Sequence, residues 1–126
     1  MSIAGIGTDI VSKQRIAEVL EANPQRFMQR LLTETELQQV PEKRDQLISF
    51  ISKRWAAKEA ISKSFGTGIG KQLSFQDLEI THLETGAPLV VLSKSAQLLA
   101  KTKNFNSVML TLSDEDDYAV AFAIAV

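Results

Sequence analysis

The sequence RWAAKEAISKSF spans residues 54–65 and lies inside the longest helical pattern of the chain. At 3.6 residues per turn, one apolar stripe of this pattern contains Ile48, Ile51, Trp55, Ser62 and Phe65. We predict a helix from Pro41, in the first turn, to Phe65, with Gly66 as its C-cap. The alanines at 56, 57 and 60 make the helix narrow, so other elements can pack closely on several of its sides.

Three charged residues, Lys58, Glu59 and Lys63, interrupt the apolar character of this helix. A charge in such surroundings costs free energy unless it is paired or binds a metal or ligand. Glu59 and Lys63 are four residues apart, in the order that favours an ion pair. Two interpretations stay open: a solvated ion pair at the edge of the core, or part of a binding site.

The residues before this helix indicate one strand and several short helices. Residues 3–11 read as a strand, and Gly5 and Gly7 within it indicate that its backbone approaches another element closely. A helix over residues 13–22 is predicted from its Ser12 cap and ends before Pro24. A second short helix is expected around Phe27 to Leu32, and the capping box of Thr33 and Glu36 starts another.

The residues after the long helix change to a period of two. Strands are predicted over residues 78–83, 87–92, 107–113 and 118–126, one of them nearly all apolar and expected to be buried. Residues 93–103 read as a short helix, and 114–117 as an acidic turn. We therefore predict one α+β domain over residues 1–126, with a small, mostly antiparallel sheet packed on one long helix and several short helices.

Composition excludes several classes of protein. The chain has 126 residues and a net charge of −1, so its overall charge favours neither nucleic acid nor a membrane surface. It has no cysteine, which excludes disulfides and thiolate chemistry. No apolar run is long enough to span a bilayer, and the N-terminus lacks a signal peptide. We expect a cytoplasmic protein that binds no nucleic acid and no membrane.

Asp9 is the second acidic candidate, at the end of the first predicted strand. A carboxylate there is suited either to face a ligand or to cap the following helix. Two carboxylates suit one Mg²⁺, which fills its remaining positions with water and substrate phosphate. Asp9 and Glu59 could therefore form a magnesium site if the fold brings them together.

Two further segments carry weaker signals. The glycines of residues 66–70 could cradle phosphate with their backbone amides, but they follow a helix and match neither dinucleotide nor Walker spacing, so taken alone they favour a C-cap and turn. Arginines lie beside apolar residues in the N-terminal helices, which suits either docking to an acidic amphipathic helix or simple solvation. The residues of this second segment are Arg15, Arg26, Phe27, Met28 and Arg30.

Together, several blocks of the sequence resemble the bacterial holo-[acyl-carrier-protein] synthases of the 4′-phosphopantetheinyl transferase family. They are GIGTDIV at residues 5–11, RWAAKEAISKSFGTG at 54–68, GAP at 86–88, and LSD at 112–114 followed by YA at 118–119. The resemblance covers the whole chain in the right order. It implies an enzyme of fatty acid biosynthesis that moves 4′-phosphopantetheine from coenzyme A to a serine of apo-acyl carrier protein, with Mg²⁺, and releases 3′,5′-ADP.

The resemblance also implies roles for individual residues. Asp9 and Glu59 match the family's metal-binding and catalytic carboxylates, and Lys63 matches a catalytic lysine near the pyrophosphate. It further implies a homotrimer with sites between protomers. The expected coenzyme A residues are Arg54, Lys58, Gly66, Thr67, Gly68 and Pro88, and the expected carrier-docking residues are Arg15, Arg26, Phe27 and Arg30.

The sequence departs from the family at two positions where many relatives carry a cation. Asp114 stands where many have His, and Ala87 where many have Lys, so coenzyme A binding should be modestly weaker unless other cations compensate. Two alternatives to the enzyme stay open: a non-catalytic module that binds coenzyme A or a nucleotide and regulates a partner, and a purely structural trimer. Mg²⁺-dependent turnover of coenzyme A distinguishes them.

Overall fold

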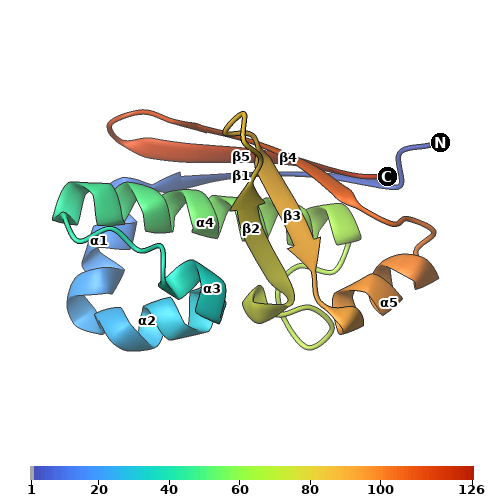
Figure 1. Ribbon diagram of the computed structural model, residues 1–126, viewed down its shortest axis with the longest axis horizontal. Coiled ribbons are helices and arrows are strands. Elements are labelled where there is room, and N and C mark those ends of the chain that lie inside the picture. The colour runs from blue at the N-terminus through green and yellow to red at the C-terminus, as the bar shows by residue number, and fades with distance from the viewer. Residues whose placement is uncertain (1) are drawn as a thin grey trace.

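A computed structural model describes residues 2–126 and contains two antiparallel sheets arranged around one long helix (Figure 1). The mixed helix and antiparallel-sheet architecture confirms the predicted α+β class. The elements, in chain order, are β1 (Gly5–Ser12), α1 (Lys13–Ala22), α2 (Pro24–Leu31), α3 (Glu34–Leu37), α4 (Arg44–Phe65), the 3-10 turn η1 (Phe75–Asp77), β2 (Leu78–His82), β3 (Pro88–Leu92), α5 (Lys94–Thr102), β4 (Val108–Asp114) and β5 (Tyr118–Ala125).

Helix α4 is the centre of the fold. The larger sheet, in the order β1-β5-β4, covers one side of it, and α1, α2, α3 and α5 lie toward the other side (Figure 1). The β2-β3 hairpin crosses in front of α4 and reaches β4 of the larger sheet. Alanines of α4 at 56, 57 and 60 are fully buried, as are the alanines of β5 at 119, 121, 123 and 125. These small side chains let the helix and the sheet approach closely.

The glycines of β1 lie where the strand meets α4. A Cβ atom added to Gly7 would lie 2.0 Å from the carbonyl oxygen of Ala60, and one added to Gly5 would lie 2.0 Å from that of Ser64. The predicted close approach is therefore confirmed, and its partner is α4. This contact places Asp9, two residues after Gly7, beside the helix that carries Glu59.

Helix boundaries follow the predicted caps with one correction. Ser12 caps α1, and Thr33 and Glu36 form the complete capping box of α3. The prediction that the long helix includes Pro41 in its first turn is wrong, because Lys43 has an extended backbone (φ −69°, ψ 133°) and acts as the N-cap. Gly66 is the C-cap, in the left-handed conformation (φ 81°).

The expectation of a nearly all-apolar, buried strand also needs correction. In β5 the side chains alternate, so the alanines face α4 while Tyr118, Val120 and Phe122 remain exposed, and in β3 Leu89 and Val91 are exposed. Each strand packs only one face on the rest of the chain. The outer face of the larger sheet is consequently apolar, with exposed Ile6, Ile10 and Met109 on the neighbouring strands.

None of the helices within residues 2–126 combines the length and the apolar character that crossing a membrane would require.

Candidate functional site

Asp9 and Glu59, fifty residues apart in sequence, line the same pocket. The pocket has a volume of about 310 Å³ and lies between β1, α1 and α4, with Phe27 of α2 at its edge. Asp9 is in β1 and Glu59 is in α4, and the close packing at Gly7 brings the two elements together. The apolar walls come from Val11, Ile16, Val19 and Trp55.

The electrostatics of this pocket reflect two half-buried carboxylates close to each other. Burial raises the pKa of Glu59, and the negative charge of Asp9 raises it further. Burial also raises the pKa of Asp9, although Lys63 opposes this change through a hydrogen bond and its charge. The site therefore holds negative charge in surroundings that disfavour it, which is the condition under which a cation binds.

Lys63 contacts Asp9 rather than Glu59. Its Nζ donates to the carbonyl oxygen of Thr8 at 2.9 Å and to Asp9 Oδ1 at 3.3 Å. In the described part of the chain no ion pair joins Glu59 to Lys63, so the solvated pair considered from their spacing is not formed. Half of the Lys63 side chain remains exposed, beside the carboxylate pocket.

A second pocket continues from the carboxylate pocket along α2. It has a volume of about 460 Å³ and is lined by Arg26, Arg30, Val19 and Phe27, together with Ala22 and Asn23. Val19 and Phe27 line both pockets, and Arg15 lines the first. All four residues expected to dock the carrier protein thus lie along one continuous surface that leads to Glu59.

Arg54 and Pro88 share a third pocket, of about 450 Å³, between α4 and the β2-β3 hairpin. Gly86 and Asp114 also line it, so one departure from the family pattern, Asp114, lies here. Lys53 and His82 add cationic or titratable groups that the sequence did not single out. Burial, Arg54 and Lys53 together lower the pKa of His82.

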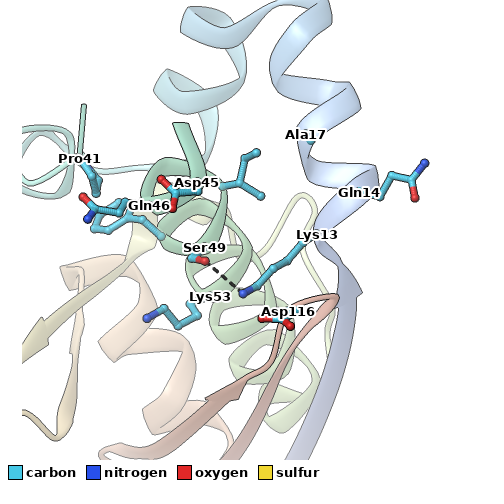
Figure 2. A pocket seen from close by; sticks show the side chains of 11 residues that line it. Lys13, Gln14, Ala17, Pro41, Asp45, Gln46, Ser49, Lys53 and Asp116 are labelled. Carbon is cyan, nitrogen blue, oxygen red and sulfur yellow. Dashed lines mark hydrogen bonds between the residues drawn. The ribbon is translucent and has the colours of Figure 1, made fainter. Parts of the chain in front are cut away.

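Asp114 does not carry an uncompensated negative charge. Lys13 Nζ lies 2.9 Å from Asp114 Oδ2 and also donates to Ser49 Oγ at 3.1 Å. The hydrogen bond from Lys13 lowers the pKa of Asp114. Figure 2 shows Lys13 and Ser49 in the neighbouring pocket of about 680 Å³, which contains neither Asp9 nor Glu59.

Lys58 is fully buried and lines none of these pockets. Its Nζ donates to Glu36 Oε1 and to the carbonyl oxygen of Leu31, both at 2.7 Å, and to that of Phe75 at 3.1 Å. Burial lowers the pKa of Lys58, while Glu36 raises it. With three acceptors already bound, the ammonium has no hydrogen left for coenzyme A, and this geometry does not support the expected contact.

The glycine-rich segment after α4 uses its amides internally. Gly66 N donates to the carbonyl oxygen of Lys63, Gly68 N to that of Ser62 and Gly70 N to that of Leu73. Thr67 Oγ1 likewise donates to Gly68 O. The local geometry is that of a helix C-cap followed by a turn, and these glycine amides are not free to cradle a phosphate.

The carboxylate pocket fits one Mg²⁺ by its chemistry. Asp9 Oδ2 is buried and accepts no hydrogen bond from any described residue. Within residues 2–126 no cluster of three or more His, Cys, Asp or Glu side chains is placed to hold a metal. Mg²⁺ binds through one or two carboxylates and leaves its other positions to water and phosphate, so the pair suffices.

The sequence does not mark Glu36 as a buried carboxylate. Its pattern indicates only the second member of a capping box, a role that Glu36 does play through its bond with Thr33 N. That same carboxylate also contacts Arg54 and Lys58. A capping box predicts a surface helix end, so no local signal marked Glu36 as the partner of two cations of α4.

Comparison with solved structures assigns this fold to a known class. A holo-[acyl-carrier-protein] synthase from Neisseria meningitidis superposes with a TM-score of 0.92 at 37% identity over 99% of both chains. Another from Bacillus anthracis, in complex with CoA (3′,5′-ADP), gives 0.83 at 37% identity over 98% of this chain and 96% of that one. The architecture is therefore that of the holo-[acyl-carrier-protein] synthases.

The sequence identifies the family. Residues 5–123 match the sequence model of the 4′-phosphopantetheinyl transferase superfamily. A holo-[acyl-carrier-protein] synthase from Vibrio parahaemolyticus is 42% identical over 124 residues, 98% of each chain. The chain belongs to the 4′-phosphopantetheinyl transferase superfamily, a family of enzymes, and this confirms the resemblance drawn from its motifs.

Proposed function

We propose that this enzyme transfers the 4′-phosphopantetheine group of coenzyme A to a serine of apo-acyl carrier protein, in support of fatty acid biosynthesis. The observation that carries the proposal is the meeting of Asp9 and Glu59 in one pocket, continuous with a basic and apolar surface on α2. The family and the relatives described above support the reaction class.

Asp9 and Glu59 would hold Mg²⁺. When bound, the ion would neutralise charge on the coenzyme A diphosphate and on the leaving group, which is the main demand of phosphoryl transfer. The buried and unpartnered Oδ2 of Asp9 supports this assignment, because a bound cation would supply its missing partner. Lys63, held beside Asp9, would add a positive charge at the edge of the same pocket.

The reaction exchanges one phosphorus–oxygen bond for another. The serine oxygen of the carrier forms a bond to the pantetheine-side phosphorus, and the bond from this phosphorus to the bridging oxygen breaks, so 3′,5′-ADP leaves with that oxygen. The serine proton passes to a base, and we assign Glu59 this role because it lies in the pocket to which the docking surface leads and burial raises its pKa above the ordinary value. Trp55 and Val11 would exclude water from the reacting atoms.

Coenzyme A binding would require two protomers. Arg54 and Glu59 are five residues apart on α4, which places them roughly 140° apart around the helix. They line separate pockets, so one chain does not present both to a single ligand. A homotrimer with sites between protomers resolves this, and the exposed apolar face of the larger sheet offers the surface for it.

Recognition of the carrier would use the surface of α1 and α2. The arginines would attract an acidic carrier protein, and Phe27 would supply an apolar anchor at the entrance to the carboxylate pocket. This arrangement would bring a docked serine close to Glu59. A cytoplasmic location remains our prediction.

Mass spectrometry tests the proposal directly. The protein is mixed with apo-carrier protein, coenzyme A and Mg²⁺, and the carrier should gain the mass of phosphopantetheine while 3′,5′-ADP appears in equal amount. A chelator should stop the reaction, and added Mg²⁺ should restore it. A carrier whose mass stays unchanged while the protein still binds coenzyme A would instead identify a non-catalytic binding module.

A further inference from the structure

Glu36 is a fully buried carboxylate on which cations and amides from several elements converge. Its Oε1 accepts hydrogen bonds from Lys58 Nζ at 2.7 Å and from Thr33 N at 2.9 Å. Its Oε2 accepts from Ile80 N at 3.0 Å and lies 3.1 Å from Arg54 Nε. The Arg54 contact is an ion pair rather than an aligned hydrogen bond, because the N–H does not point at an acceptor.

Lys58 connects this carboxylate to the helix that carries the docking surface. Besides Glu36, its ammonium binds the carbonyl oxygen of Leu31, the last residue of α2. A carbonyl at a helix C-terminus carries partial negative charge and has no partner within the helix. Lys58 precedes Glu59 on α4, so its bond to Leu31 ties the end of α2 to the turn that bears the catalytic carboxylate.

Arg54 connects the same carboxylate to the pocket that contains Pro88. Its guanidinium lies over the ring of Phe50, with the central carbon 4.5 Å from the ring centre. The Nε atom is held at Glu36, while the residue still lines the pocket with Pro88 and Asp114. Glu36 therefore fixes the side chain that faces the proposed coenzyme A pocket.

A need for stability alone does not account for this network. Buried ion pairs contribute little net stability, because well-packed apolar side chains of the same volume do as well or better. A buried charge that loses its partner is strongly unfavourable, so the members of such a network hold one another in place. Through Glu36 of α3, the network joins α2, which carries part of the docking surface, to α4 and β2, which line the pocket that contains Pro88.

We propose that Glu36 is a positioning residue: through Lys58 it sets where the carrier-docking surface of α2 lies relative to Glu59, and through Arg54 it orients the guanidinium at the coenzyme A pocket. This inference rests on the proposed function. These two connections, the α2 arm through Lys58 and the coenzyme A arm through Arg54, make separate predictions. A change at Lys58 should affect only the α2 arm, whereas a change at Glu36 should affect both.

Steady-state kinetics on the full-length protein separate the arms, with each variant assayed well below its melting temperature. Lys58→Met should raise KM for the carrier protein about tenfold and leave KM for coenzyme A unchanged, since small displacements of a docking element are costly. Glu36→Gln should raise both KM values. Neither pattern follows from a uniform loss of stability, which lowers the amount of active protein and not the affinity for one substrate.

Gln76 provides a variant that should fold even if the buried ones do not. Its exposed side-chain amide donates to the carbonyl oxygens of Gln29 and Leu32 at 2.6 Å, so it also holds the end of α2. Gln76→Ala should raise KM for the carrier only. The matched control is Gln97→Ala, because Gln97 donates to Leu92 O at 3.0 Å, a bond that does not involve α2, and it should change neither constant.

The outcomes distinguish this inference from the proposed function. If Glu36→Gln, Lys58→Met and Gln76→Ala only lower the melting temperature and leave both KM values at wild type, the network is merely structural and the inference is wrong. If the buried variants do not fold, Gln76→Ala tests whether the position of the end of α2 affects carrier binding, and a wild-type KM for the carrier would overturn that half of the inference. A wild-type protein that loads no carrier would overturn the proposed function, and this inference with it.

Discussion

Among the single residues of the site, Lys63 of α4 connects its helix to β1, because its Nζ donates to Thr8 O and to Asp9 Oδ1. Because half of its side chain is exposed, Lys63→Ala should cost at most about 1 kcal/mol of unfolding free energy. Turnover should fall, but less than when a carboxylate is removed. Urea denaturation and steady-state kinetics measure the two effects, and unchanged turnover would reduce Lys63 to a structural contact.

The sequence predicted the meeting of Asp9 and Glu59 only through the family motifs. Spacing alone cannot show that Asp9, which lies within β1, and Glu59, in the middle of α4, share a pocket, because the contact depends on how β1 packs on α4. Lys58 is a case in which the family motif did not indicate the contacts that the side chain makes. Its position beside Glu59 in the motif indicated a ligand contact, whereas the helix turns its side chain inward to Glu36.

The packing of β1 on α4 is the contact between elements on which the site depends most. Gly7→Ala should destabilise the fold by about 3 kcal/mol or more, because the new methyl would meet the carbonyl oxygen of Ala60 at 2.0 Å. Gly70→Ala is the matched control, since its Cβ would meet no atom within 4 Å. Equal unfolding free energies for the two variants would contradict the close approach.

Helices α1 and α2 should recognise the carrier by charge. Arg26→Glu or Arg15→Glu should raise KM for the carrier and leave KM for coenzyme A nearly unchanged. The effect should be larger at low salt, because the screening length of charges falls to about 8 Å near physiological ionic strength. Kinetics at two salt concentrations measure this. If both variants bind the carrier normally at low salt, the docking surface lies elsewhere.

Most elements were predictable because their signals are local. Ser12, Thr33 and Gly66 each end or begin a helix by a cap that the sequence shows. The start of α4 was not predictable, because Pro41 suits both a first helical turn and the extended segment it occupies. The exposure of one face of β5 also escaped prediction, since an apolar strand reads as buried whether its cover is the same chain or another copy.

At the scale of the whole molecule, that apolar sheet face should assemble the active enzyme. We expect a wild-type mass three times that of the 13.9 kDa protomer. Phe122→Glu places a charge on the exposed face of β5, where the side chain is 38% exposed, and should give folded, inactive protomers. Light scattering and turnover are the measurements, with Leu98→Glu on exposed α5 as the control. A fully active wild-type monomer would contradict the proposal that two protomers form each active site.

The proposed transfer depends most on the two carboxylates, so the rate of carrier modification in their absence tests it most directly. Asp9→Ala and Glu59→Ala are compared with wild type by mass spectrometry of the carrier at saturating Mg²⁺ and coenzyme A. We predict that each variant stays folded and oligomeric but loses turnover by about a hundredfold or more. Near wild-type turnover in either variant would contradict the assignment of this pocket as the site of transfer.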